Sequence, residues 1–276
     1  MKKLLMLCTF AVFGLSQASA QLDDDDYGFL NHVSLGVSGG TDGIGFQLAT
    51  PLGYHFALRA GYSFMPAFKY SQSLTLDKTG SLGAFTTDKV ELEGKLNVGN
   101  VSVLLDIYPS KKSSFRFTVG AYIGKDDIVT ISNKEPFLNP AYAGMAGIDL
   151  SKKGSTVFEK YTIVTDKDGN IDGKVKVNGF KPYVGIGFGR AIPRKRVGLQ
   201  FDLGVQFWGK PELQTNLMYY DGETGDFVTR YEAVDKSRIT RSQDDKDYKD
   251  VRDALKTAEA FTVYPVMTFR LVGRLF

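Results

Sequence analysis

Eight segments of this chain place an apolar side chain at every second position, and this alternation limits the fold more than any other feature. Because successive side chains of a strand point to opposite faces, each such segment predicts a strand with one apolar face. The clearest example is VGLQFDLGVQF, residues 197–207. The same pattern recurs at about 32–38, 44–49, 54–64, 100–107, 115–123, 183–189 and 261–275.

Two architectures bury strands of this kind, a soluble β-sandwich and a membrane barrel. The segments are long enough for tilted strands that cross a membrane, and the connections alternate in length, with large loops at about 67–90, 124–179 and 209–260. The second face of the strands is rich in glycine, which suits the narrow lumen of an eight-stranded barrel. We therefore predict an all-β fold, an eight-stranded antiparallel transmembrane β-barrel with long external loops and one short helix.

The N-terminus reads as an export signal. Residues 1–20 contain Lys2 and Lys3, an apolar run and an Ala-Ser-Ala cleavage site, so we assign them as a signal peptide. An acidic N-terminal spacer with the run Asp23–Asp26 covers 21–30, and the barrel covers 31–276. The predicted organisation is thus one exported membrane domain behind a removable leader.

Composition excludes several kinds of function for the mature chain. Cleavage removes the only cysteine and two of the 34 basic residues, which leaves 32 against 31 acidic ones and a net charge of +1. A chain without thiols has no disulfide, thiolate zinc site or cysteine nucleophile. The balanced charge also argues against a nucleic-acid partner, which would require a basic stripe.

Five charged residues fall at inward-facing positions and at similar heights in the predicted barrel. They are Arg59, Asp106, Arg116, Asp202 and Arg270. Buried charges must be paired and hydrogen-bonded, so we expect one connected network that plugs the lumen. A gated ion path through the same charges is the alternative.

Other candidate chemistry is sparse. Asp166, Asp168 and Asn170 carry oxygen ligands at alternate positions, but the glycine and glutamate of an EF-hand are missing. We interpret this stretch as a surface hairpin tip between YTIV and KVKV, with a calcium loop as the alternative. His32 and His55 both fall at periplasmic, inward-facing ends. The sequence therefore predicts neither a metal nor a catalytic site, and no cofactor.

Residues 242–260 carry the pattern of a helix. Ser242 is a possible N-cap, acidic residues follow in the first turn, and Tyr248, Val251 and Leu255 share one stripe. We expect this helix over the outer mouth of the barrel, packed on it or in contact with an external partner.

The signal peptide, the eight amphipathic strands and the terminal FRLVGRLF together resemble the small outer-membrane β-barrel proteins of Gram-negative bacteria, the OmpA/OmpX-like class. The resemblance implies export through the periplasm to the outer membrane, contact with lipid and lipopolysaccharide, and recognition of Phe276 by the barrel assembly machinery. Arg274 departs from the apolar residue that members carry two places before the terminal aromatic.

Function is less constrained than location. Our first hypothesis is a non-enzymatic outer-membrane protein whose external loops have a surface, structural or adhesion role. A small pore for ions or small solutes is the second, and an outer-leaflet lipid-modifying enzyme is the third. The external ligand is unknown, because assigning function from a fold alone is analogy.

Overall fold

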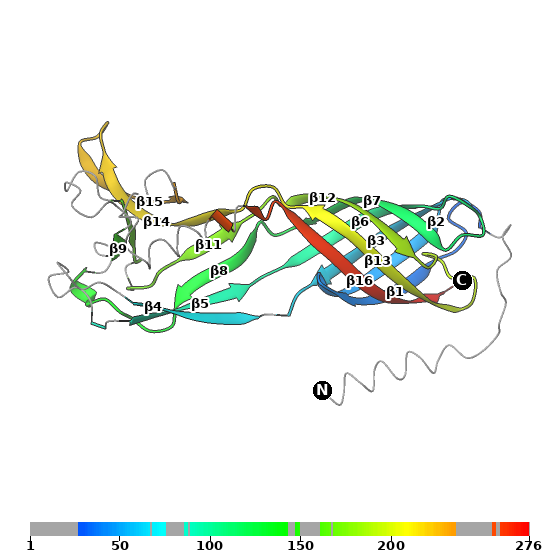
Figure 1. The fold of residues 1–276 in the computed structure, drawn as a ribbon, viewed down its shortest axis with the longest axis horizontal. Helices are drawn as coiled ribbons and strands as arrows, with labels where there is room; N and C mark the ends of the chain where they lie inside the picture. Colours follow the sequence, from blue (N-terminus) through cyan, green and yellow to red (C-terminus); the bar gives the residue numbers. More distant parts are fainter. Residues whose placement is uncertain are drawn as a thin grey trace, which may run out of the picture.

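The computed structural model contains two connected β-sheets (Figure 1). It describes residues 27–66, 68–75, 86–87, 89–142, 147–149, 161–166, 168–235, 256–257 and 260–275. The signal peptide, most of the acidic spacer and Phe276 lie outside these residues. So does most of the helix expected over 242–260, of which Lys256, Thr257 and Ala260 are described and helical.

The first sheet is a closed antiparallel barrel of eight strands, as the alternation predicts. Neighbours follow the order β1-β16-β13-β12-β7-β6-β3-β2. The strands are β1 (Ser34–Gly40), β2 (Gly43–Pro51), β3 (Phe56–Phe64), β6 (Gly99–Ile107), β7 (Phe115–Gly124), β12 (Phe180–Phe188), β13 (Val197–Phe207) and β16 (Val263–Arg274). Closure leaves no unpaired edge in the barrel wall.

The apolar face of these strands is the outside of the barrel. On β13, Leu199 is 77% exposed, whereas its neighbour Gln200 is 3% exposed. Every barrel strand presents such outward apolar side chains, for example Val37, Phe46, Leu58, Val103, Val119, Ile186, Leu199 and Leu271. A continuous apolar surface of this kind is stable against lipid and not against water. The barrel is thus a membrane-spanning wall of the outer-membrane type.

Within the described residues, no helix is long and apolar enough to cross a membrane. Besides the helical residues Lys256, Thr257 and Ala260, the described part of the chain contains a 3₁₀ turn, η2 (Pro140–Tyr142).

A second sheet lies within the three regions expected as long loops, except for β5, most of which follows the first of them. Its order is β4-β5-β8-β11-β14-β10-β9, and β15 pairs with β14. Its strands are β4 (Lys69–Thr75), β5 (Lys89–Leu96), β8 (Asp127–Asn133), β9 (Gly147–Asp149), β10 (Tyr161–Val164), β11 (Gly173–Lys176), β14 (Glu212–Asp221) and β15 (Asp226–Ala233).

This second sheet continues the barrel wall. β4, β5, β8, β11 and β14 extend β3, β6, β7, β12 and β13 in the same order. Backbone hydrogen bonds cross the junctions, from Asn97 N to Ile128 O, from Val177 N to Asp126 O and from Asn178 N to Trp208 O, each 2.8 Å long. The wall therefore rises beyond the barrel on five of its eight strands.

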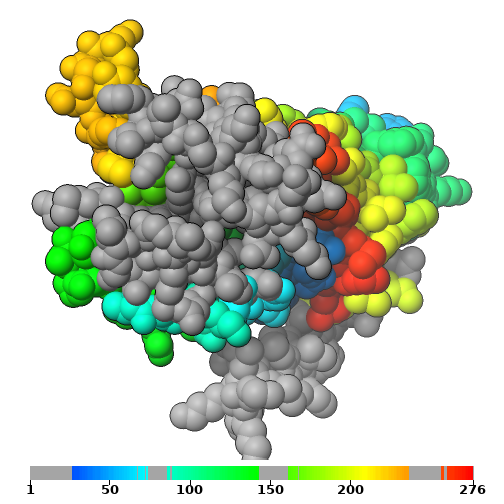
Figure 2. All heavy atoms as spheres, turned by 60° about the vertical axis from the view of Figure 1, so that its left-hand side comes forward, coloured from blue at the N-terminus to red at the C-terminus, as the bar shows by residue number. Residues whose placement is uncertain are grey.

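At β1 and β2 the described wall has no such extension, because the connection between these two strands is short. Thr41 and Asp42 alone join these two strands, and no second-sheet strand follows them. At the far end of the molecule, β14 and β15 form a two-stranded hairpin that stands out from the rest of the described chain (Figures 1 and 2).

Side-chain polarity reverses between the two sheets. Outward positions of β6 are apolar, as at Val101, whereas the outward positions of β5 include Lys95 and Glu91, both exposed. The inner face of the second sheet is apolar and packs Val90 and Ile171 against Phe137 and Leu138. The outer surface is therefore suited to lipid along the barrel and to water along the second sheet.

Candidate functional site

The barrel lumen holds the five predicted charges, each from a different strand. Arg59 lies on β3, Asp106 on β6, Arg116 on β7, Asp202 on β13 and Arg270 on β16. All five side chains are buried. Each of the five lies between two apolar residues that point outward. Because successive side chains of a strand point to opposite faces, the charged side chain between them points inward.

The structure brings all five into one network of ion pairs. Asp202 stands at its centre, because Oδ1 lies 2.7 Å from Arg116 Nη2 and Oδ2 lies 2.6 Å from Arg270 Nη1 and 3.2 Å from Arg59 Nη1. Asp106 Oδ1 lies 2.8 Å from Arg59 Nη2, and Asp106 Oδ2 lies 3.2 Å from Arg116 Nε. Three guanidinium groups therefore share two carboxylates.

A glycine makes the space that this network occupies. A Cβ on Gly187 would lie 2.8 Å from both Arg116 Cζ and Asp202 Oδ1. Thr118 completes the shell by donating its hydroxyl to Asp106 Oδ1 at 2.7 Å. The glycine on the inner face thus leaves room for the large charged side chains of Arg116 and Asp202.

A second layer of packed side chains lies in the lumen between the charges and the second sheet. Tyr122 and Tyr183 contact edge to face with ring centroids 5.4 Å apart, and Leu104 and Val266 pack against them. Above them Lys181, almost fully buried, donates to Asn100 Oδ1 at 2.9 Å and to the Lys125 carbonyl at 3.0 Å.

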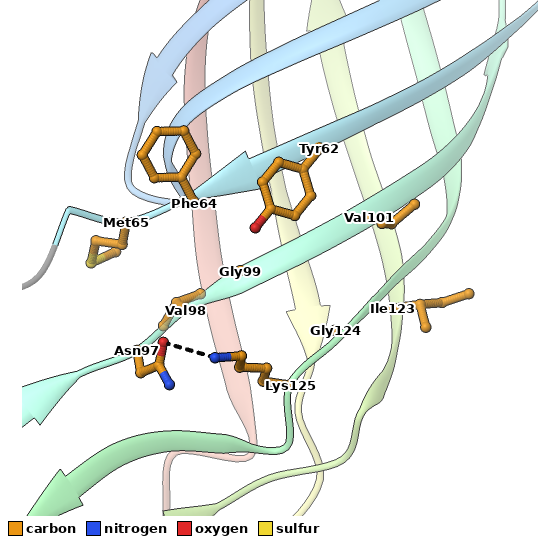
Figure 3. A pocket seen from close by; sticks show the side chains of 10 residues that line it. All are labelled: Tyr62, Phe64, Met65, Asn97, Val98, Gly99, Val101, Ile123, Gly124 and Lys125. Carbon is orange, nitrogen blue, oxygen red and sulfur yellow. Dashed lines mark hydrogen bonds between the residues drawn. The ribbon is translucent and has the colours of Figure 1, made fainter.

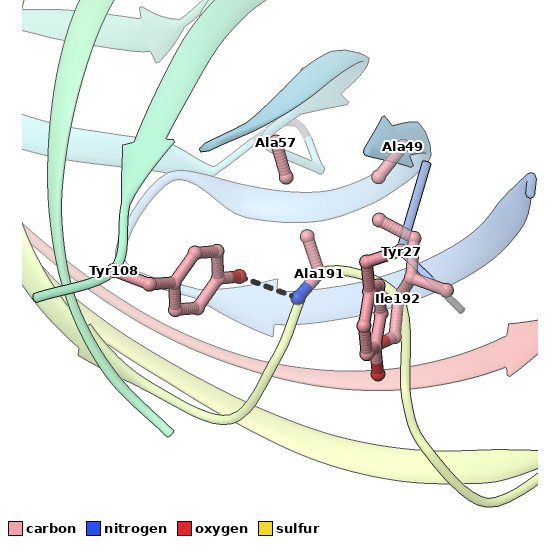
Figure 4. Close-up of a cluster of buried hydrophobic side chains, with 6 residues drawn as sticks. All are labelled: Tyr27, Ala49, Ala57, Tyr108, Ala191 and Ile192. Atoms are coloured by element: carbon pink, nitrogen blue, oxygen red, sulfur yellow. Dashed lines mark hydrogen bonds between the residues drawn. The ribbon is translucent and has the colours of Figure 1, made fainter. Parts of the chain in front are cut away.

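A third layer lies at the end of the barrel away from the second sheet. The β12–β13 turn folds into the barrel mouth, where Ala191 and Ile192 pack against Tyr27 and Tyr108 (Figure 4). Ala191 N donates to the Tyr108 hydroxyl at 2.7 Å, and the Tyr27 hydroxyl donates to the Ile192 carbonyl at 3.2 Å. Burial raises the pKa of Tyr27 above its ordinary value, which keeps this hydroxyl a donor.

Arg190 fastens this third layer. Its Cζ lies 4.4 Å from the ring centroid of Tyr27 and 4.5 Å from that of Tyr108. Its guanidinium donates to the carbonyls of Lys111, Ser113 and Tyr54. The turn is therefore held by one cation in contact with two rings and three backbone acceptors.

The other predicted candidates are not brought together. Asp166 Oδ1 accepts backbone N–H bonds from Asp168 at 2.9 Å and Asn170 at 2.8 Å, which makes a turn rather than a ligand set. His55 is exposed, contrary to the inward position expected, because it lies in the β2–β3 turn and the strand β3 begins only at Phe56. Among the described residues, no group of three or more His, Cys, Asp or Glu side chains could hold a metal.

The interpretation of 166–172 as a hairpin tip is correct for the turn and for the strands at YTIV and KVKV, but wrong for their pairing with each other. β10 and β11, which contain YTIV and KVKV, both pair antiparallel with β14, through Ile163–Leu217 and Gly173–Thr215. They follow one another along the same neighbour and do not pair with each other, and the residues between them make a local turn in which Asp166 N donates to the Asn170 carbonyl at 2.8 Å.

Two buried cations of the lumen were missed by the sequence prediction. Lys181 lies in phase with the inward Tyr183, so the alternation of GFKPYVG contained its signal. Arg190 lies in a turn, where no periodicity indicates direction, and only the folded structure places it. Phe276, the expected assembly signal, lies outside the described residues.

No family model and no curated protein matches this chain. Among solved structures, the chain is similar to Acinetobacter baumannii CarO2, with 14% identity, a TM-score of 0.44 and coverage of 88% of this chain and 98% of the other. It is likewise similar to Acinetobacter baumannii CarO, with 17% identity, a TM-score of 0.44 and coverage of 89% and 99%.

Proposed function

We propose that this chain is a non-enzymatic outer-membrane protein in which a sealed barrel anchors an extracellular β-sheet with a surface, structural or adhesion role. The observation that carries the proposal is the continuity of five barrel strands into the second sheet. A wall that continues by backbone pairing holds the sheet at a fixed angle to the membrane, which a flexible loop would not do.

The contents of the lumen favour an anchor over a pore. Three packed layers follow one another along the axis, and the narrow interior of an eight-stranded barrel leaves little room beside them. The charge network is therefore proposed as the middle of a plug, with Arg59 and Asp202 among its members, rather than as an ion path.

The same contents bear on the enzymatic alternative. His55 lies on the periplasmic β2–β3 turn, where its Nδ1 donates to the Tyr108 carbonyl at 2.9 Å. A lipid-modifying enzyme of the outer leaflet would need its base at the opposite end. Unchanged lipid A masses in cells with and without this protein are the expected result. A protein-dependent change in mass would replace the anchor with an enzyme.

Export to the outer membrane of a Gram-negative bacterium, contact with its lipopolysaccharide and insertion by the barrel assembly machinery form part of this proposal. The apolar outer wall and the leader-like residues 1–20 support them.

Single cysteines on intact cells test the display of the second sheet. The mature chain has no thiol, and a Cβ at Gly222, in the β14–β15 turn, meets nothing within 4 Å. We expect Gly222→Cys to react with a membrane-impermeant maleimide on whole cells. Lys112→Cys, in the exposed β6–β7 turn, is the matched control and should react only after the outer membrane is permeabilised. Labelling of Lys112→Cys alone on intact cells would contradict the proposed orientation.

A further inference from the structure

A groove on the outer wall of the barrel lies at the level where the wall changes from apolar to polar. It encloses about 420 Å³ and crosses β3, β6 and β7. Its lining includes Tyr62, Phe64, Val101 and Ile123, which are all exposed to the membrane side (Figure 3).

Gly99 forms the floor of this groove. Strand pairing sets Gly99 opposite Phe64, one outward row above the row of Tyr62, Val101 and Ile123. A Cβ at Gly99 would lie 3.0 Å from the Tyr62 hydroxyl, so a larger residue would fill the space beneath that ring. In the next row toward the periplasm, Ala60 and Ala121 flank Val103 and keep the wall shallow.

Lys125 supplies a cation at the upper rim of the groove. It is exposed, and its Nζ lies 3.3 Å from Asn97 Oδ1 (Figure 3). The neighbouring Asp126 is paired with Lys176 at 3.4 Å, and no ion pair involves Lys125 within the described part of the chain. Its charge therefore faces the groove rim without a carboxylate partner.

Lys125 belongs to a set of lysines that follow the apolar belt. Lysines occur within a few residues of the second-sheet ends of five barrel strands, at Lys69, Lys95, Lys125, Lys176 and Lys210, and two of them are paired, Lys69 with Glu93 and Lys176 with Asp126. Lys125, one residue beyond β7, lies where the apolar outer face ends, which is the level at which an anionic headgroup region would meet the wall. The groove thus combines an apolar trough in the hydrocarbon region with a cation at headgroup level.

We propose that this groove binds a phosphorylated, acylated lipid of the outer leaflet, with a phosphate on Lys125 and an acyl chain across Gly99 toward Ala60 and Ala121. The charge of Lys125 matches a phosphate, and the apolar trough matches a saturated acyl chain. A free anion would use only the first of these two features. The Tyr62 hydroxyl, above Gly99, offers a further donor at the same rim.

Binding of bisphosphorylated lipid A to the detergent-folded mature chain, measured by native mass spectrometry, tests the proposal. Lys125→Gln should weaken binding about fivefold, the effect of one lysine at an anionic lipid surface. Lys112→Gln, an exposed lysine at the periplasmic end, is the charge-matched control and should leave binding unchanged.

A second pair of variants tests the trough. Gly99→Leu fills the groove and should weaken binding of both bisphosphorylated and dephosphorylated lipid A. Gly39→Leu, on β1 where a Cβ meets nothing within 4 Å, should not. A heat-dependent shift in electrophoretic mobility shows that each variant is folded.

Three results would overturn the proposal. One is equal binding by Lys125→Gln and Lys112→Gln, and another is equal binding by Gly99→Leu and Gly39→Leu. The third is displacement of the lipid by millimolar inorganic phosphate, which would indicate an anion site without a lipid role. These outcomes are independent of maleimide labelling on cells, so surface display and lipid binding can fail separately.

Discussion

At the scale of single residues, Asp202 carries more of the lumen network than any other charge. It contacts Arg59, Arg116 and Arg270, whereas Asp106 contacts two of the three. Asp202→Asn leaves three buried guanidinium groups around one carboxylate. We expect it to destabilise the barrel by about 3–5 kcal/mol, because an uncompensated buried charge is costly. The measurement is the temperature at which the compact band is lost on electrophoresis.

The double variant distinguishes pairing from independent effects. Removing Arg59 as well returns the network to the native excess of one positive charge. The double variant Arg59→Met with Asp202→Asn should therefore be more stable than Asp202→Asn alone. Losses that simply add would argue against direct pairing between the two side chains.

Asp42, in the β1–β2 turn, gives a pH-dependent prediction. Burial raises its pKa above the usual 3.8, although a hydrogen bond from Thr268 and the charge of Arg270 act in the opposite direction. An acid with a raised folded-state pKa loses stability as pH rises from its unfolded value through its folded value, and the cost persists at neutral pH. Asp42→Asn should therefore raise the unfolding temperature at pH 7 and have no effect below pH 3.8.

The amide also retains an oxygen that can accept the Thr268 hydrogen bond, so the comparison isolates ionisation. A lower unfolding temperature for Asp42→Asn at pH 7 would show that the carboxylate stabilises the rim.

The residues whose position was predicted correctly all lie in strands, where alternation decides whether a side chain points into the barrel or out of it. Arg116 and Asp202 each stand between outward apolar neighbours, so their inward position follows from period two alone. Leu104 broke the apolar-out pattern, and the structure explains it as a lumen residue packed on Tyr122 and Tyr183. The position of Arg190 could not be predicted, because side chains in a turn do not alternate between two faces.

At the scale of elements, the β12–β13 turn is the part of the fold that depends most on one side chain. Arg190→Met removes the contacts with the rings of Tyr27 and Tyr108 and the hydrogen bonds to three carbonyls, of which that of Lys111 still accepts from Arg194 Nη2 at 3.0 Å. We expect a loss of about 2–4 kcal/mol from the free energy of unfolding, measured by urea titration in detergent. Lys195→Met, an exposed change in the same turn, should cost little, and equal losses would refute a fastening role for Arg190.

The strands of the second sheet were predictable in part. KVELEGKL, which forms β5, alternates charged and apolar residues as regularly as any barrel strand. Its polar face is charged instead of glycine-rich, because it faces water rather than a lumen, and this difference hid its continuity with β6. The pairing of β10 and β11 with one strand, β14, depends on contacts distant in sequence and has no local signature.

At the scale of the whole molecule, one continuous antiparallel wall forms both the membrane barrel and the sheet beyond it. The outer face is apolar along the barrel and polar along the second sheet. Both faces come from the same alternation of side chains, but the apolar side chains point outward in the barrel and inward in the second sheet. Closure into eight strands was predictable from strand number and loop lengths. The outward extension of five strands was not, because nothing in strand number limits how far each strand continues.

Conductance of the purified mature chain in a planar lipid bilayer tests the sealed barrel most directly. If the three layers fill the lumen, insertion should produce no discrete current steps above the baseline of the bilayer. Folding in the same preparation is verified by the heat-dependent mobility shift. Reproducible single-channel steps from the folded protein would contradict the plug and establish the charge network as part of an ion path.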